Sequence, residues 1–181
     1  MAHRIDEILD IRKKKLAQMA AAGVDAYPSS VNRTHTNAQA LEQFLQLKNK
    51  KVSLVGRIRA FRPMGKIAFL HIDDGTARIQ ILARKDALGK EAHMLEWIDL
   101  GDFVECSGKL IASKTKEKTL EATSIRMLAK SLRPLPTEHF GLEDDEMRLR
   151  QRYLDILLHP ETRELFVKKA RFWNSMRGFL D

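Results

Sequence analysis

Three consecutive segments in the middle of the chain alternate apolar and polar residues, which is the pattern of half-buried β-strands. Even positions supply the apolar residues in 52–59 and again in 68–72, where Phe69 and His71 fall on the other face. Odd positions supply them in 77–81. Because successive side chains of a strand point to opposite faces, the pattern predicts neighbouring strands of a sheet with one buried face.

The polar face of these strands carries side chains suited to single-stranded nucleic acid. Arg57 and Arg59 lie on it in the first segment, Phe69 in the second, and Arg78 and Gln80 in the third. An aromatic ring can stack on a base, guanidinium groups can bind phosphate, and a carboxamide offers a donor and an acceptor to a base edge. The alternation therefore predicts a binding face. The alternative is that Phe69 packs under a loop and the arginines are only solvated.

The region from residue 51 to residue 128 has the pattern of a small β-barrel. Its predicted strands cover residues 51–62, 66–73, 76–83, 102–111 and 119–128. A helical segment from Asp86 to Ile98 separates the third strand from the fourth, and that order is the order of the OB-fold. Gly56 inside the first strand fits a bulge or a sharp bend of a coiled barrel. A five-stranded meander of another kind is the alternative.

Helices are expected on both sides of the barrel, so the predicted fold class is α+β, a five-stranded OB-fold β-barrel with N-terminal helices and a C-terminal helical segment. Residues 4–22 have apolar residues at helical spacing, and Gly23 stands where a helix ends. The opposite face carries basic residues from Arg12 to Lys15. These are either a solvated helix face or phosphate contacts.

A capping box predicts a second, shorter helix before the barrel. Thr36 is placed as the N-cap, and Gln39 follows three residues later. Leu41, Phe44 and Leu45 would give this helix one apolar side.

The last fifty residues change in character. Two prolines predict an extended path across residues 131–142. A helix over about 143–158 opens with acidic residues that suit a helix N-terminus, and another begins at Pro160, placed as an N1 proline. The predicted division is a helical extension over 1–48, the barrel over 51–130, the linker over 131–142 and the helical segment over 143–181.

The charge of the chain favours a polyanionic partner. Its formal net charge is +8, and residues 131–181 hold equal numbers of cationic and acidic side chains, so the excess lies in the first 130 residues. A basic balance of this kind suits nucleic acid, although many basic domains bind none. The predicted loop over 112–118 adds Lys114, Lys116 and Lys118 beside Glu117. A charged hairpin tip in solvent is the alternative reading of this loop.

Other functional classes find little support. No apolar run approaches the length of a membrane span, and the N-terminus lacks the features of a signal peptide, which favours a cytoplasmic setting. Cys106 is the only cysteine, so no intrachain disulfide can form, and it is expected in the core. The six histidines include no helical i, i+4 pair, and no phosphate-binding loop or nucleophile motif is present. We predict no catalytic residues, no metal site and no cofactor within this chain.

Several strings of residues resemble one enzyme family. They are Met64-Gly65-Lys66 ahead of Phe69, Arg78-Ile79-Gln80, Leu132-Arg133-Pro134-Leu135-Pro136 and Arg150-Gln151-Arg152-Tyr153-Leu154-Asp155. In this order, and over nearly the whole chain, the sequence resembles the N-terminal part of class II lysyl-tRNA synthetases of bacterial type. The last two strings favour the lysyl enzymes over their aspartyl and asparaginyl relatives, which share the OB-fold.

The resemblance implies roles for particular residues. In this family the OB-fold binds the tRNA anticodon, whose middle uridine stacks on the phenylalanine that matches Phe69. Arg57 and Gln80 match residues that contact anticodon bases. Glu117 matches a glutamate that helps to read an adjacent base, although Lys116 stands where the family commonly has glycine. The candidate phosphate contacts are Arg59, Arg78, Lys114 and Lys116.

The resemblance also implies which activity to expect. The family's catalytic domain follows the linker, binds ATP, Mg²⁺ and lysine through motifs 2 and 3, and forms most of the dimer interface. The enzyme joins lysine to its tRNA through a lysyl-adenylate. Motifs 2 and 3 are absent here, and the chain stops before motif 1 is complete, so we expect a piece that binds the anticodon arm of lysine tRNA without charging it.

Two other functions are compatible with the residues. One is a free-standing OB-fold module that binds single strands without sequence preference. The other is an interaction domain whose last helix docks a partner.

Overall fold

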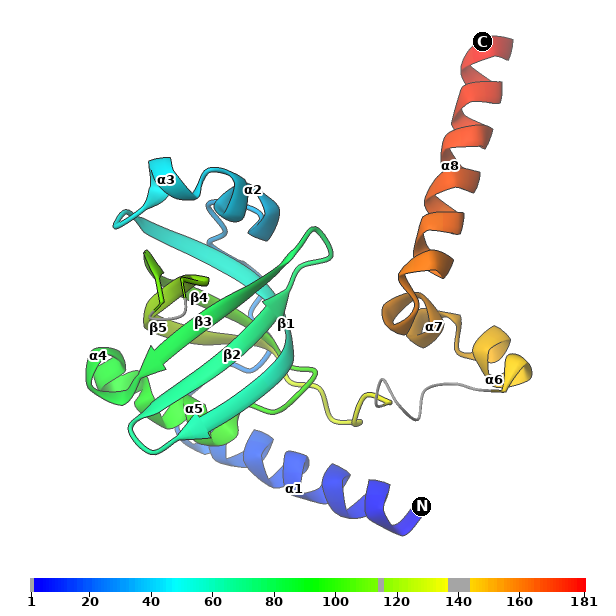
Figure 1. Ribbon diagram of the computed structural model, residues 1–181. Helices are drawn as coiled ribbons and strands as arrows, with labels where there is room; N and C mark the ends of the chain where they lie inside the picture. Colours follow the sequence, from blue (N-terminus) through cyan, green and yellow to red (C-terminus); the bar gives the residue numbers. More distant parts are fainter. Residues whose placement is uncertain (1, 114–115, 137–143) are drawn as a thin grey trace. The chain divides into compact units, whose positions relative to one another are not determined.

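The computed structural model describes residues 2–113, 116–136 and 144–181, with side chains from residue 5 onward (Figure 1). The chain divides into two compact units, Met1–Pro134 and Leu135–Asp181. Each unit is described here by itself.

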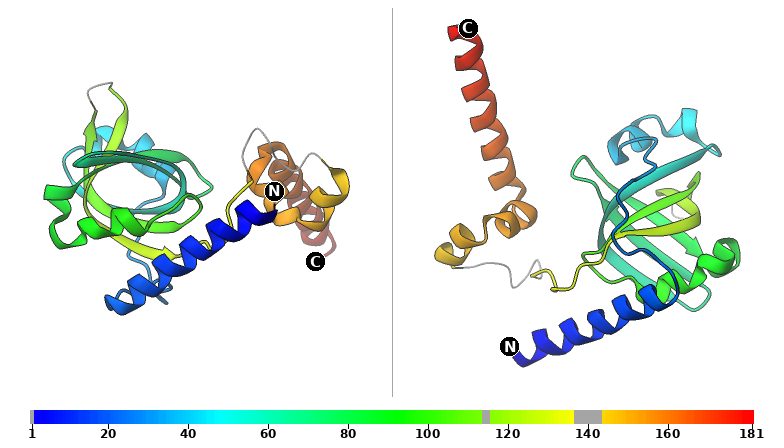
Figure 2. Two further views of the ribbon diagram at one scale, coloured as in Figure 1. Left: turned by 90° about the horizontal axis from the view of Figure 1, so that it is seen from below. Right: turned by 180° about the vertical axis from the view of Figure 1, so that it is seen from behind.

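The first unit is built around a closed five-stranded barrel. Its strands are β1 (Lys51–Met64), β2 (Ile67–Asp73), β3 (Arg78–Arg84), β4 (Phe103–Ala112) and β5 (Lys118–Ala129). They follow the order β1-β2-β3-β5-β4, and β4 pairs back with β1 to close the ring (Figure 2). Among the pairings of these five strands, as far as they are described, β3 pairs with β5 in parallel and the other four pairings are antiparallel. This is the predicted OB-fold, and each strand end lies within two residues of its predicted position.

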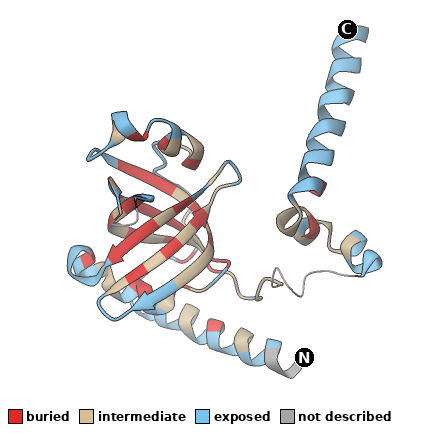
Figure 3. Ribbon diagram, viewed as in Figure 1, coloured by how far each residue is buried: buried red, intermediate tan, exposed pale blue. Residues whose placement is uncertain are grey.

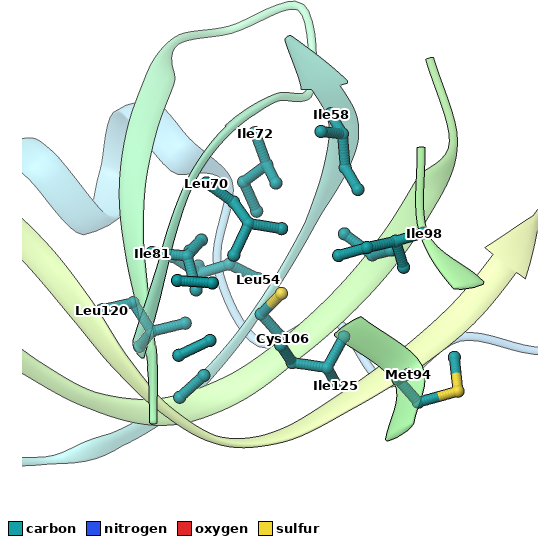
Figure 4. Close-up of a cluster of buried hydrophobic side chains, with 14 of the residues drawn as sticks. Leu54, Ile58, Leu70, Ile72, Ile81, Met94, Ile98, Cys106, Leu120 and Ile125 are labelled. Carbon is teal, nitrogen blue, oxygen red and sulfur yellow. The ribbon is translucent and has the colours of Figure 1, made fainter. Parts of the chain in front are cut away.

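The alternation seen in the sequence is the division between the inside and the outside of the barrel (Figure 3). Leu54, Leu70, Ile72 and Ile81 are fully buried, and Figure 4 shows them in the interior beside Cys106. Full burial of one such aliphatic side chain stabilises a fold by about 1.5–3 kcal/mol. The prediction that Cys106 is a core residue is confirmed.

Strand β1 is long enough to pair on both sides of the barrel. Arg57 stands opposite Asp73 of β2 and also opposite Phe103 of β4. A Cβ atom on the preceding residue, Gly56, would lie 2.9 Å from the backbone of Asp73. Gly56 therefore permits a close approach of two backbones, and the irregular pairing comes slightly later, between Ile58 and Ala60.

Helix α1 (Ala2–Ala21) ends as predicted. Gly23 has a φ of 73°, and its N–H donates to the carbonyl of Ala20 at 3.0 Å. The N–H of Val24 donates to the carbonyl of Met19 at 2.9 Å. These two bonds form the glycine-dependent cap that satisfies the last carbonyls of a helix.

The basic side of α1 is solvated at Lys13 and Lys14 but not at Arg12, for which neither of the two expected readings foresaw burial. Arg12 is buried, and its guanidinium donates to the carbonyls of Ser131 and Leu100 at 2.8 and 3.0 Å. Lys15 bonds to Asp99 at 2.7 Å. These contacts join α1 to the loop before β4 and to the segment after β5, which a helical period alone does not reveal.

The capping box on the second helix is confirmed. Helix α2 (Asn37–Glu42) has Thr36 as its N-cap with both reciprocal hydrogen bonds to Gln39. The prediction that Leu45 belongs to the apolar side of this helix was wrong, because Leu45 is 86% exposed. The helix breaks at Gln43, so α3 (Phe44–Leu47) begins with a new phase that buries Phe44 and turns Leu45 outward.

The single helix predicted between the third and fourth strands is three short pieces. They are α4 (Lys85–Leu88), η1 (Gly89–His93) and α5 (Met94–Trp97). Gly89 has a φ of 54°, a left-handed conformation that ends α4. The pieces still bury Leu88, Met94 and Leu95 in the barrel core.

The second unit consists of α6 (Asp145–Arg150), α7 (Arg152–Leu158) and α8 (Pro160–Leu180). The one helix predicted over 143–158 is divided at Gln151, whose φ of −111° and ψ of 50° are not helical. Pro160 is at the start of α8, as predicted. Residues 137–143, which include the second half of the predicted linker, lie outside the described residues.

Candidate nucleic-acid interface

The predicted site residues share the outer face of the barrel. Arg57 comes from β1, Phe69 from β2, Gln80 from β3, and Glu117 from the loop that leads into β5. The three strands lie side by side in Figure 1. Strand β5 places the buried residue Thr119 in register with Gln80. Barrel closure therefore brings positions 60 residues apart in the sequence onto one surface.

Phe69 lies on this outer face between residues of the two neighbouring strands. It stands opposite Arg62 of β1 and opposite Leu82 of β3. Its sequence neighbours Ala68 and Leu70 are buried, whereas Phe69 is partly exposed. The ring therefore does not belong to the barrel core, and a partly exposed ring of this kind is able to stack on a base.

Arg57 is held in place by two groups of the protein. Its guanidinium carbon lies 4.2 Å from the centre of the Phe103 ring, and Nη1 donates to the carbonyl of Gly101 at 3.3 Å. Burial, followed by the nearby charge of Arg59, lowers the pKa of Arg57 from its usual value. Cation–π contact of this kind restricts the guanidinium. The sequence did not single out Phe103, because its contact with Arg57 arises only where β4 meets β1.

Gln80 and Glu117 bond directly to each other. The amide Nε2 of Gln80 donates to Oε2 of Glu117 at 2.7 Å, and the hydroxyl of Thr119 donates to Oε1 of Gln80 at 2.8 Å. The other carboxylate oxygen of Glu117 is 3.4 Å from Nε2 of His71. Alternation had placed His71 on this face without a role. No sequence signal marked Thr119, since it depends on the parallel pairing of β3 with β5.

Lys116 adopts the backbone conformation that the glycine expected at its position would take. Lys116 has a φ of 63°, the left-handed conformation that glycine adopts most easily. The N–H of Lys116 donates to the carbonyl of Ser113 at 2.9 Å, and the N–H of Glu117 donates to Oγ of Ser113 at 3.0 Å. Lysine in place of the expected glycine therefore leaves Glu117 beside Gln80.

Three of the four candidate phosphate contacts lie in the described part of the chain. Arg59 follows Arg57 on β1, Arg78 is exposed at the start of β3, and Lys116 is exposed in the loop. Arg78 also stands opposite Asp73 in the β2–β3 register. Lys114 lies outside the described residues.

Other chemistry is limited where the chain is described. Burial, and next the charge of Glu105, raise the pKa of the Cys106 thiol to about 12, so a reactive thiolate does not form at neutral pH. Over residues 2–113, 116–136 and 144–181, no group of three histidine, cysteine or carboxylate side chains is placed to hold a metal ion. Within the same ranges, no helix is both long enough and apolar enough to cross a membrane.

Comparison with known proteins places this surface in a family. Residues 52–128 match a model of the OB-fold nucleic acid binding domain of the tRNA anticodon type. The lysine–tRNA ligase of Carboxydothermus hydrogenoformans is 41% identical over 100% of this chain and 38% of its own length. That of Pelotomaculum thermopropionicum is 39% identical over 98% of this chain and 35% of its own length. The chain thus spans little more than a third of these relatives. Along its whole length the chain is therefore homologous to lysine–tRNA ligases, and residues 52–128 match an OB-fold nucleic acid binding domain.

Proposed function

We propose that this chain binds the anticodon arm of a lysine tRNA through the outer face of β1, β2 and β3. The observation that carries the proposal is the convergence of Arg57, Phe69, Gln80 and Glu117 on one surface of the barrel. The relatives are named as lysine–tRNA ligases, which supports lysine tRNA as the partner.

Each side chain has a distinct role in this proposal. An anticodon base stacks on Phe69, a contact worth about 1–3 kcal/mol. Gln80 and Arg57 contact base edges, because a carboxamide offers both a donor and an acceptor and a guanidinium offers several donors. The phosphates are bound by the surrounding cations Arg59, Arg78, Lys114 and Lys116.

We place the chemistry of the family outside this chain. In this proposal ATP, Mg²⁺ and lysine bind to the parts of the relatives that residues 1–181 do not match, and the lysyl-adenylate forms there. Those parts also supply the dimer interface. This chain alone then binds tRNA without charging it, and the encounter takes place in the cytoplasm.

The proposal is tested by the affinity of the chain for anticodon stem-loops that differ only in the middle base, at several salt concentrations. We expect tighter binding of the loop with uridine, by about 1–3 kcal/mol for a well-made base contact. Equal affinity for all four loops, lost together as salt rises, would instead favour a module without sequence preference. A chain that binds no RNA at any salt concentration would favour the interaction-domain alternative.

Replacing Phe69 by alanine tests the stacking contact directly. We expect Phe69→Ala to weaken binding of the uridine loop by about 1–3 kcal/mol, because the base loses the ring it stacks on. Thermal unfolding of the barrel should change little, since Phe69 lies on the outer face. Phe179→Ala in α8, where the ring is exposed, is the matched control. Unfolding of the barrel by Phe69→Ala would show that the ring serves the core.

A further inference from the structure

Thr119 is a buried residue directly behind the candidate interface. It is fully buried, and its hydroxyl lies 2.8 Å from Oε1 of Gln80 and 3.1 Å from the carbonyl of Glu117. Because none of its surface is exposed, Thr119 cannot itself touch an RNA base. Any effect of its hydroxyl on binding must therefore pass through Gln80 or the neighbouring backbone.

The two partners of Gln80 define which way its carboxamide faces. An ionised carboxylate only accepts hydrogen bonds, so Glu117 must face the amide nitrogen of Gln80. The amide oxygen then lies on the other side, where the hydroxyl of Thr119 donates to it. In the opposite orientation, two acceptor oxygens would meet at the 2.7 Å contact with Glu117. The carboxamide is therefore held at both ends.

We infer that Glu117 and Thr119 clamp the carboxamide of Gln80 in one orientation, and that Thr119 is thereby a positioning residue for the choice between uridine and cytidine. The inference rests on the proposed function of this face. It is carried by the hydrogen bonds at both ends of the amide and by the complete burial of Thr119.

The clamp matters because uracil and cytosine present opposite patterns to an amide. Uracil offers an acceptor at O4 and a donor at N3, whereas cytosine offers a donor at N4 and an acceptor at N3. A carboxamide that rotates freely can serve either base by exchanging its oxygen and nitrogen. One amide proton of Gln80 is bonded to Glu117, and one lone pair of its amide oxygen is bonded to Thr119. The other amide proton and the other lone pair are left for a base, and their positions on the surface cannot be exchanged. That fixed order serves only one of the two bases.

The binding test compares stem-loops with uridine or cytidine at the middle position. We expect Thr119→Val, which keeps the shape of the side chain, to reduce the uridine-to-cytidine affinity ratio by about fivefold, the factor equivalent to one ordinary hydrogen bond. Thr119→Ser should restore the ratio. Thr123→Val on the same strand is the matched control, because the Thr123 hydroxyl bonds to the carbonyl of Ser107 rather than to the site. If Thr119→Val does not fold, Thr119→Ala takes its place.

A second measurement does not depend on RNA. A primary amide gives two proton signals in the NMR spectrum whatever its orientation, so the readout is their position: both side-chain amide proton signals of Gln80 in the free chain should shift in Thr119→Val. The clamp is contradicted if Thr119→Val leaves the uridine-to-cytidine affinity ratio unchanged. It is also contradicted if the amide proton signals of Gln80 do not shift in Thr119→Val. If the wild-type chain does not distinguish uridine from cytidine, the proposed function fails, and the amide signals alone decide whether the clamp exists.

Discussion

The absence of a Cβ atom at Gly108 allows the backbones of β4 and β5 to approach closely. A Cβ atom built on Gly108 would lie 2.0 Å from the carbonyl oxygen of Glu121, a backbone atom that cannot move aside independently. The pairing of the two strands is irregular at this point, between Ser107 and Gly108. The absence of a side chain at Gly108 is therefore a condition for closing the barrel.

We expect Gly108→Ala to destabilise the barrel by about 3 kcal/mol or more, the upper part of the range for overpacked sites. Chemical denaturation followed by two-dimensional NMR of the barrel amides measures the loss. Gly178→Ala in α8 is the control, since a Cβ there meets nothing within 4 Å. It should leave barrel stability unchanged and strengthen the helix by about 0.8–1.0 kcal/mol. Equal stability of the Gly108→Ala barrel and the wild type would contradict this account.

At the scale of elements, one carboxylate joins α6 to α7. Asp155 is buried and bonds to Arg148 at 2.9 Å, to His159 at 2.8 Å, and to Arg152. Burial acts to raise the pKa of Asp155, but the three hydrogen bonds outweigh it and lower the pKa to about 2 from an ordinary 3.8. The junction of the two helices therefore depends on an ionised group.

This lowered pKa sets the direction of the acid response. The carboxylate contributes its full stabilisation above its unfolded pKa of 3.8, and the contribution is lost as the pH falls toward the folded pKa of about 2. We expect the amide signals of α7 to lose dispersion between about pH 4 and pH 2. Asp155→Asn should show the same loss already at pH 6. Asp145→Asn is the control: its side chain is 90% exposed, so this variant should behave as the wild type. If the α7 signals of the wild type keep their dispersion down to about pH 2, α7 does not depend on the ionised Asp155.

The whole molecule consists of two units with very different cores. The buried hydrophobic cluster runs from Met19 to Met127, entirely within the first unit. The second unit is dominated by α8, whose large apolar residues are mostly exposed. Stability and the candidate interface thus reside in the same 134 residues.

A chain that ends at Pro134 should therefore keep both the barrel and its RNA affinity. Its amide spectrum should overlay that of the barrel in the full chain, and its affinity for the uridine stem-loop should agree within about twofold, a difference smaller than one ordinary hydrogen bond. Collapse of the spectrum would show that residues 135–181 support the barrel. A folded barrel with lost affinity would instead place part of the RNA contact in those residues.

Local features of this protein could be predicted from its sequence. Period-two alternation assigned the inner faces of the first three strands, because the pleat of a strand is a property of the backbone alone. The fourth and fifth strands were also placed correctly, but without their faces. The Thr36 capping box and the Gly23 helix end were equally local. The breaks at Gln43, Gly89 and Gln151 were missed, since apolar spacing continues through a short interruption.

The sequence by itself therefore determined which strands form, which faces they bury, and which side chains the outer face displays. Only the tertiary structure decided which of those side chains meet. Gln80 contacts Glu117 and Thr119 across separations of 37 and 39 residues, and Arg57 contacts Phe103 only where β4 closes on β1. The physical reason is that a strand's pattern specifies its faces but not its neighbours, whereas barrel closure selects the neighbours and, with them, the arrangement of hydrogen bonds around Gln80.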